Sequence, residues 1–295
     1  MMRPQLKVFG AILAAAAMVL TACGSSGDKK VGTLTPLGDK LPASIQKSGV
    51  IRVGSDIEYP PIEFFKEGTK TVQGLDYDLA QAMGQALGVK FTFTNDTDFA
   101  GIIGAMNSGR FDIIMSAMND TAERRGKGVD FIDYFLAGSS IIVKKGNPSK
   151  IASVDDLCGK TIAVQKGTIQ ETDIITPQVA KCAAAKKPLT VLALEKDADA
   201  LQQVSTGRAV ANLEDSPVAG YNAGTSGGGN DFEVVGDKIG AGPYGLAVPT
   251  KSTQLRDALQ AALKAVIADG SYDTILAKWH IEAGALKTAE LNGGS

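Results

Sequence analysis

The sequence predicts an α/β fold built on largely parallel sheets. Short apolar runs alternate along the chain with segments whose apolar residues recur at helical spacing, and this alternation occurs in two successive blocks. Strands that alternate with helices form parallel sheets whose faces are covered by the helices. The folded part, about 250 residues, is long enough for one large domain or two medium ones.

The first block predicts three strands and two helices. The strands are short apolar runs at residues 50–53, 91–94 and 112–115. The helices have apolar side chains at helical spacing and cover residues 78–87 and 99–108. Gly88 and Gly109 follow these helices as stop signals, and Asp98 precedes the second one as a candidate N-cap.

The second block repeats the pattern. Its strands are predicted at residues 161–164, 189–194 and 209–213, and its helical segments at 153–157 and 197–205. A long amphipathic helix at 255–266 and a shorter one with Tyr272 and Trp279 follow. The glycine-rich stretch 224–230 lacks a strand–GxGxxG–helix setting, so it predicts a surface loop rather than a phosphate site.

The first 22 residues, 1–22, have the composition of a signal peptide. Arg3 and Lys7 give a basic start, and the apolar run at 8–20 is shorter than the roughly 20 residues that a membrane-spanning helix needs. The run ends in Leu-Thr-Ala-Cys, which resembles the lipobox of bacterial lipoproteins and predicts lipidation of Cys23. The alternative is an ordinary cleaved signal peptide with an incidental cysteine. We expect an extracytoplasmic protein, anchored by lipid to the outer face of the cell membrane.

The chain on either side of the predicted folded body lacks apolar periodicity. Residues 23–40 are rich in Gly, Ser, Lys and Asp, so we expect a flexible tether between the membrane and the body. The last residues, 287–295, are expected to be a disordered tail.

Charge and composition exclude two classes of function. Removal of the signal peptide takes Arg3 and Lys7, which leaves 28 of the 30 basic side chains against 32 acidic ones and a net charge near −4. Because no basic stripe is present, nucleic acid is excluded as a partner. A single histidine, His280, and the lack of a CxxC pair leave too few ligands for a metal site, and we expect no cofactor.

Two cysteines, Cys158 and Cys182, remain in the folded part of the chain. In an exported protein disulfides persist, so an even pair favours a bond between them. Their separation of 24 residues corresponds to a stabilisation of roughly 3–4 kcal/mol by loop closure. The alternative is a pair of free, buried thiols.

The ends of the predicted strands are the expected place for a binding site. Parallel sheets bind ligands beyond the carboxyl ends of their strands. The segments that follow predicted strands and carry polar or aromatic side chains are 55–61, 116–124, 165–168 and 214–217. We therefore expect the binding residues in these four segments.

Arg124 is the basic candidate in these segments. Thr121 predicts the start of a helix, whose open N–H groups attract an anion, and Arg124 one turn further on can hold a carboxylate with its planar guanidinium. The alternative is a surface arginine that pairs with Asp130 or Asp133.

Asp215 is the acidic candidate. It directly follows a strand and could bind an ammonium group, or it could simply cap the helix that follows it. Tyr59, in a rigid Tyr-Pro-Pro turn, and Phe99, at a helix start, could flank an aliphatic ligand side chain, and either could instead belong to the core.

An ordered set of short motifs resembles the polar-amino-acid family of solute-binding proteins that serve ABC importers. They include Gly-Leu-Asp-Tyr-Asp-Leu-Ala at 74–80 and Thr-Ala-Glu-Arg at 121–124. The other matching segments are 54–61, 98–99, 109–112, 130–131, 159–161, 167–168 and 270–272. Any one motif is weak, but together they keep the family order over residues 41–280.

The resemblance implies a role for each candidate residue. Arg124 would bind the α-carboxylate of the ligand and Asp215 its α-ammonium group. Tyr59 and Phe99 would flank the ligand side chain, and Asp56 would contact its polar tip. Further positions implied to line the pocket or to offer backbone N–H groups are Ser116, Ala117, Asn119, Gln165, Thr168 and Ile169.

The expected ligand is a small polar amino acid. Asn119 stands where the family commonly has serine or threonine, and Ile169 where threonine is frequent, so Ile169 offers only its N–H. An ionised Asp56 would repel an acidic ligand side chain, which favours a cationic or amide one.

The family also implies the architecture, a two-lobed periplasmic-binding-protein-like (type II) fold with two crossover hinge strands. The first lobe would take residues 41–138 and 241–286, and the second lobe 139–240. A monomeric receptor would close about this hinge on its ligand and deliver it to an ABC permease in the membrane.

Two rival functions remain open at this point. Some exported dehydratases resemble these receptors, and a dehydratase acting on a prephenate- or arogenate-like substrate would need a general acid or base. Glu171 is the nearest candidate, although it is better explained as a helix-start carboxylate. The second rival is a ligand-sensing or adhesive surface lipoprotein. We expect a binding protein rather than an enzyme.

Overall fold

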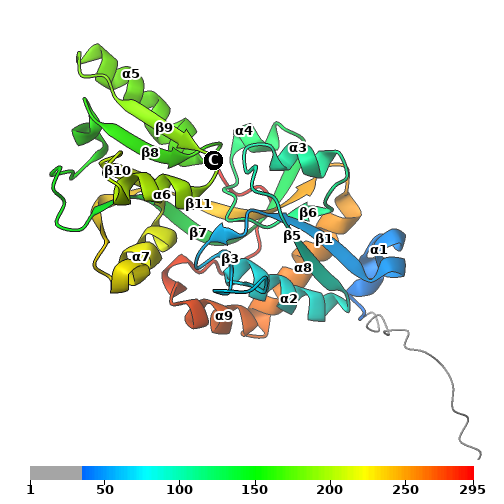
Figure 1. Ribbon diagram of the computed structural model, residues 1–295. Helices are drawn as coiled ribbons and strands as arrows, with labels where there is room; N and C mark the ends of the chain where they lie inside the picture. Colours follow the sequence, from blue (N-terminus) through cyan, green and yellow to red (C-terminus); the bar gives the residue numbers. More distant parts are fainter. Residues whose placement is uncertain (1–34) are drawn as a thin grey trace, which may run out of the picture. The chain divides into compact units, whose positions relative to one another are not determined.

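The structure, a computed structural model, describes residues 35–295 (Figure 1). The predicted signal peptide, Cys23 and the first part of the predicted tether lie outside the described residues. The described chain forms two lobes, each with parallel strands and covering helices, which are joined by two long antiparallel strands. The prediction of a two-lobed α/β fold with two crossover strands is therefore confirmed.

The first lobe has β1 (Val50–Ser55) between two parallel neighbours, β5 (Lys90–Asn95) and β6 (Ile113–Ile114). Three short strands form a separate antiparallel sheet: β2 (Glu58–Tyr59), β3 (Glu63–Phe65) and β4 (Val72–Gln73). The helices of this lobe are α1 (Ala43–Ser48), α2 (Leu75–Leu87), α3 (Ile102–Asn107), α4 (Ala122–Arg125), α8 (Thr253–Ala268) and α9 (Ser271–Trp279).

The core of the first lobe follows from the helical periodicity in the sequence. Leu79, Met83 and Leu87 form the buried stripe of α2, and Leu259 and Leu263 form that of α8, which packs against it. Burial of one such side chain contributes about 1.5–3 kcal/mol. This packing gives the lobe a core of its own, so the loops at its strand ends are held in place.

The second lobe has β8 (Thr161–Gln165) between two parallel neighbours, β9 (Thr190–Leu194) and β10 (Ala211–Asp215). Its helices are α5 (Thr176–Ala184), α6 (Asp197–Ser205) and α7 (Ser216–Thr225), with a π-helix at Gln170–Ile175. A 3-10 turn at Val154–Leu157 begins with a capping box between Ser153 and Asp156. The apolar residues of β8, α5 and this turn form a core separate from that of the first lobe.

Two long strands connect the lobes. β7 (Val129–Lys144) and β11 (Phe232–Pro249) pair antiparallel through both of them, which gives the strand order β5-β1-β6-β11-β7-β10-β8-β9. The pairing is irregular between Val235 and Gly242. There, Gly138 lies so close to the carbonyl oxygen of Gly240 that a side chain would not fit. The lobe boundaries predicted after residues 138 and 240 fall in this irregular part of the ladder.

The prediction of a disordered tail at 287–295 is wrong. Ala289 is buried, and the backbone N–H groups of Asp133 and Asn292 form hydrogen bonds that join this segment to β7. The tail lacks apolar periodicity, but its backbone groups pair with an edge that the rest of the fold leaves open. Composition alone does not show such a pairing.

The predicted tether, 23–40, is also too long at its C-terminal end. Within the described residues, the Thr35 hydroxyl donates a hydrogen bond to the carbonyl oxygen of Ala86. A 3-10 turn at Gly38–Lys40 then leads into Leu41, which is fully buried. A single apolar anchor therefore orders the residues before it, although they show no periodic pattern.

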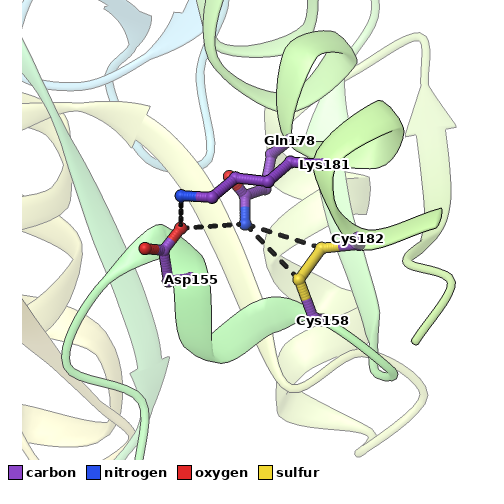
Figure 2. Close-up of a disulfide and its surroundings, with 5 residues drawn as sticks. All are labelled: Asp155, Cys158, Gln178, Lys181 and Cys182. Carbon is purple, nitrogen blue, oxygen red and sulfur yellow. Dashed lines mark hydrogen bonds and ion pairs between the residues drawn. A yellow bond between two sulfur atoms is a disulfide. The ribbon is translucent and has the colours of Figure 1, made fainter. Parts of the chain in front are cut away.

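Cys158 and Cys182 form the predicted disulfide, which joins the 3-10 turn before β8 to α5 (Figure 2). Gln178, one turn before Cys182, lies 3.5 Å from both sulfur atoms through its amide nitrogen. The same amide donates to Asp155 (3.2 Å), which also pairs with Lys181 (2.6 Å). These contacts fix α5 to the loop that precedes the central strand of the second lobe.

Candidate functional site

A cavity lies between the lobes at the carboxyl ends of the parallel strands, as the strand-end rule predicts. The empty space between its lining atoms is about 300 Å³, which includes space open to solvent. The residues that line it are Asp56, Tyr59, Glu63, Phe99, Ser116, Ala117, Asn119, Arg124, Gln165, Thr168, Gln170 and Asp215. Every predicted ligand-binding residue except Ile169 belongs to this set.

Ile169 faces a different hollow. Its side chain lines a neighbouring depression on the outer side of Arg124, together with Phe99 and Gly167. The chain turns at Ile169 into the π-helix that begins at Gln170, so adjacent side chains point to different sides. The side chain of Ile169 is therefore not part of the cavity wall, and the predicted use of its N–H stays a prediction.

Arg124 is held in place by both lobes. Thr121 caps α4, since its hydroxyl accepts the N–H of Arg124 (3.3 Å). The guanidinium donates to the carbonyl oxygen of Asn119 (2.9 Å) and, across the lobes, to that of Gly167 (3.0 Å), and it stacks on Phe99 with 5.4 Å to the ring centre. Burial lowers the pKa of Arg124 to about 10, so the side chain stays charged at neutral pH.

The alternative pairing of Arg124 with a surface carboxylate is wrong. Asp130 forms an ion pair with Arg256 (2.8 Å) instead. Asp133 accepts the N–H of Gly293 (3.0 Å) on the far side of β7. Arg124 itself is only 6% exposed and lines the cavity between the lobes, where it could bind an anionic group of a ligand.

Asp215 is buried at the end of β10 and does not cap α7 with its side chain. The carboxylate accepts hydrogen bonds from the Tyr59 hydroxyl (3.1 Å) and from the Gln170 amide (2.8 Å). Burial raises its pKa to about 6, and these hydrogen bonds and the charge of Arg124 limit the rise. An ammonium group in the cavity would favour the ionised form.

Two more carboxyl groups, Asp56 and Glu63, lie in the cavity wall of the first lobe. Asp56 Oδ2 accepts from the Gln165 amide (2.7 Å), and Glu63 Oε1 accepts from the Ser116 hydroxyl (3.0 Å). The second oxygen of each, Asp56 Oδ1 and Glu63 Oε2, is buried without a hydrogen-bond partner among the described residues. Both oxygens therefore have unmet hydrogen-bonding capacity. Glu63 also lies beside the buried carboxyl group of Asp76, with which it can share a proton.

The protonation of these two groups depends on burial. Burial raises the pKa of Asp56 to about 7, against the hydrogen bond from Gln165. Burial also raises the pKa of Glu63 well above its usual range, and the nearby Asp76 adds to the rise. A cation between Asp56 and Glu63 would reverse both shifts, because an opposite charge favours the ionised carboxylate.

Asn119 contributes a group of the opposite polarity. Its amide nitrogen, Nδ2, is buried without a partner among the described residues, while its backbone oxygen accepts from Arg124. The cavity thus combines a free amide donor and a guanidinium, which suit an anion, with free carboxylate oxygens, which suit a cation.

Direct contacts hold the two lobes together around the cavity. In addition to the bonds of Arg124, Asp56 and Tyr59 described above, Glu58 forms an ion pair with Lys196 at the rim (2.6 Å). Phe64 of β3 contacts two aromatic rings, Tyr221 of α7 in the second lobe (5.9 Å between ring centres) and Trp279 of α9 in the first (5.7 Å). The described conformation is therefore closed.

Sequence reasoning missed Glu63 and Gln170. Glu63 lies opposite Tyr59 in the β2–β3 pair, and directly paired residues project to the same face of a sheet. Recognition of this hairpin would have placed Glu63 beside Tyr59. Gln170 gave no comparable signal, because its direction depends on the π-helix that it begins.

Among residues 35–295, no group of three or more His, Cys, Asp or Glu side chains is arranged to hold a metal ion. In the same residues, no helix combines the length and the apolar character that a membrane crossing requires.

Comparison with known proteins identifies the family. Residues 51–282 match the bacterial extracellular solute-binding proteins, family 3. The arginine-binding protein ArgT of Corynebacterium glutamicum is 36% identical over 253 residues, which cover 85% of this chain and 81% of that protein. The fold matches an ancestral arginine-binding protein bound to arginine, with 36% identity, a TM-score of 0.70, and 78% of this chain and 98% of that one covered.

A further similar structure is relevant to the alternative hypothesis that the protein is a dehydratase. It is an ancestral amino acid-binding protein described as a precursor of cyclohexadienyl dehydratase, with 38% identity, a TM-score of 0.70, and 80% of this chain and 97% of that one covered. These relatives are binding proteins. From the match over most of its length, the chain belongs to the bacterial extracellular solute-binding proteins of family 3.

Proposed function

We propose that this protein captures a cationic amino acid, with L-arginine as the first candidate, and delivers it to an ABC importer. The observation that carries the proposal is the distribution of charge in the cavity. Arg124 and Asp215 can hold the two charges of an amino acid head group, and two further carboxyl groups, Asp56 and Glu63, each offer an oxygen without a partner.

The head group is expected to bind at Arg124 and Asp215. The guanidinium of Arg124 suits a carboxylate, and the free Nδ2 of Asn119 adds a donor beside it. Asp215 is a buried acceptor for the α-ammonium group, and the backbone N–H of Thr168 is a further candidate for the carboxylate. This arrangement favours a free α-amino acid over a ligand that lacks one of the two head-group charges.

The ligand side chain is expected to extend toward Asp56 and Glu63. A guanidinium carries five N–H donors in one plane and can satisfy both unpaired carboxylate oxygens at once. An acidic side chain would place a negative charge beside the carboxyl groups of Asp56 and Glu63, which disfavours glutamate and aspartate. The rings of Tyr59 and Phe99 supply apolar surface for the aliphatic part. Two of the similar proteins above are described as arginine-binding, which supports this choice.

Closure between the lobes would provide the link between binding and delivery. A ligand that contacts both lobes favours the closed conformation by its differential affinity for that state. Opening would release it to a permease. We propose a monomeric receptor that is anchored through Cys23, although Cys23 lies outside the described residues.

Titration calorimetry with free amino acids tests the ligand. We expect L-arginine to bind most tightly, L-lysine and L-glutamine more weakly, and L-glutamate not measurably. Binding of glutamate alone would contradict the proposed charge match. Saturation by arginine should also raise the melting temperature, because a ligand that binds only the folded state stabilises it.

The variant Glu63→Gln tests the proposed side-chain contact. It keeps the shape of the side chain but prevents the ionisation that a bound cation would favour, so arginine should bind about 10- to 100-fold more weakly, the range for a hydrogen bond to a charged group. L-glutamine should lose much less. Glu67→Gln, in the exposed turn between β3 and β4, is the matched control and should leave both affinities unchanged.

A turnover assay tests the rival dehydratase. Glu171, the residue named for such an activity, does not line the cavity, and its carboxylate accepts the N–H of Gly167 (2.6 Å). We therefore expect no consumption of prephenate or arogenate. Turnover that disappears in Glu63→Gln would show instead that a carboxyl group of the cavity serves as an acid.

A further inference from the structure

The last seven residues of the described chain, 289–295, lie beyond the part that matches family 3, which ends at residue 282. They pack antiparallel along β7. Asp133 donates its backbone N–H to the carbonyl oxygen of Glu290 (2.9 Å), and Asn292 forms a two-way pair with the backbone of Phe131, at 2.9 and 2.8 Å. We call this segment the C-terminal strap.

The strap ends at the start of α4, and Figure 1 shows the C-terminus beside that helix. Gly294 donates its N–H to Asp120 Oδ2 (2.8 Å) and accepts from the Arg125 guanidinium (3.2 Å). Ala122, at the first position of α4, donates its N–H to the carbonyl oxygen of Ser295 (2.7 Å). Asp120, Ala122 and Arg125 are not among the residues that line the cavity.

These contacts reach residues that do line the cavity. The clamp segment, residues 118–125, carries Asn119 and Arg124, which are joined by the bond from the guanidinium to the Asn119 carbonyl oxygen. On one side, Asp120 donates its N–H to Pro243 of β11 (2.9 Å). On the other side, the carboxylate of Asp120 receives the strap and forms an ion pair with Arg125. The clamp segment is thus held between β11 and the strap.

We propose that the C-terminal strap positions Arg124 and Asn119 for the α-carboxylate of the ligand, an inference that rests on the proposed function. The strap acts through Asp120 and Ala122 and touches no ligand. Displacement of a binding group by about 1 Å can cost a large part of its effect. Loss of the strap should therefore lower the affinity for ligands that carry the α-carboxylate and leave the affinity for ligands without it nearly unchanged.

Two substitutions release the strap in different ways. In Gly294→Ala, the new methyl group would overlap the carbonyl oxygen of Asp120. Asn292→Ala instead removes the side-chain contacts to Phe131 and Asp130 without adding bulk. Gly220→Ala, on the exposed side of α7 with open space around it, is the matched control.

The experiment compares L-arginine with L-argininamide, which has the same side chain and ammonium group but lacks the carboxylate. Both are titrated into the full chain and into each variant by calorimetry, after circular dichroism has shown that the variant is folded. We expect Gly294→Ala and Asn292→Ala to lower the affinity for arginine about tenfold or more and the affinity for argininamide less than about twofold. The Gly220→Ala control should change neither affinity.

The outcomes separate the strap from the proposed function. Equal weakening of both compounds, or of neither, would overturn the positioning role, since a merely structural strap has no preference for the carboxylate. If Gly294→Ala does not fold, the same comparison with Asn292→Ala decides. A wild-type chain that binds neither compound would contradict the proposed function instead.

Discussion

The two lobes contribute different kinds of groups to the cavity. On the first lobe, Asp56, Glu63 and Asn119 each have a buried polar atom without a partner among the described residues. On the second lobe, the amides of Gln165 and Gln170 are already bonded to carboxylates, one of them across the lobes. An unpaired buried polar atom costs free energy, so a ligand that pairs these atoms would stabilise the first lobe more than the second. Under the proposed function, the ligand would then dock on the first lobe, and the second lobe would close over it.

Removal of Arg124 should have the largest effect on affinity, because it takes the basic group from the docking lobe. Truncating one partner of a buried charge pair costs about 2–5 kcal/mol, or about 30- to several-thousand-fold in Kd. Arg124→Ala should therefore nearly abolish arginine binding in calorimetry while the chain stays folded. Arg110→Ala, an exposed arginine paired with Asp96, is the control and should bind normally.

The corresponding change on the second lobe is Asp215→Ala. It should weaken arginine strongly but less than Arg124→Ala, because the first lobe can still hold the ligand by its carboxylate and side chain. Asp215 also bonds to Tyr59 in the closed form, so its removal weakens closure as well. An equal or larger loss from Asp215→Ala would break the proposed division between docking lobe and closing lobe.

A block to closure should have the next largest effect. A methyl group at Gly167 would lie 2.7 Å from the Cα of Ala100 on the other lobe, and φ at Gly167 is +78°. Such crowding costs about 1–3 kcal/mol, so Gly167→Ala should weaken arginine about 5- to 150-fold, mainly through faster dissociation in stopped-flow measurements. Gly146→Ala has a similar φ, +80°, and open space, so it controls for backbone strain. Unchanged dissociation in Gly167→Ala would contradict a closing role for this contact.

The pH dependence should separate binding from stability. The pKa of Asp56 is raised to about 7 and that of Asp215 to about 6, while a cationic ligand requires both ionised. Arginine affinity should therefore fall as the pH decreases from about 8 to about 5, with proton release on binding. The stability of the protein without ligand should change with pH in the opposite direction. The raised pKa values mean that the folded state binds these protons more tightly, so stability falls as the pH rises toward about 7. Calorimetry in two buffers and melting curves measure the two trends, and parallel trends would exclude this assignment.

The disulfide should have the smallest effect on affinity, because Cys158 and Cys182 lie within the second lobe, away from the cavity. Replacement of both by alanine should destabilise the chain by about 2–4 kcal/mol, seen as a lower melting temperature. Arginine affinity at low temperature should change less than about twofold. A large loss of affinity with unchanged stability would show that the position of α5 matters for closure.

The residues that could be predicted from the sequence are those fixed by local rules. Thr121 signals the start of α4, and from there the family motif places Arg124, while Asp215 follows a strand whose end is readable from its apolar run. Glu63 and the C-terminal strap could not be predicted in this way. Glu63 depends on the pairing of a hairpin, and Asn292 bonds to Phe131, which lies 161 positions earlier in the chain. Contacts between residues so far apart in the sequence produce no periodic pattern from which they could be predicted.

The aromatic contact between the lobes offers a practical consequence. Trp279 is the sole tryptophan of the chain, and Phe64 stands between it and Tyr221 of the opposite lobe. When the lobes separate, Tyr221 leaves Phe64, so the surroundings of the indole change without any chemical label. The intrinsic fluorescence of the protein should thus report opening and closing in real time. Tyr221→Leu, which lacks the aromatic contact in both states, is the reference variant and should show a smaller fluorescence change.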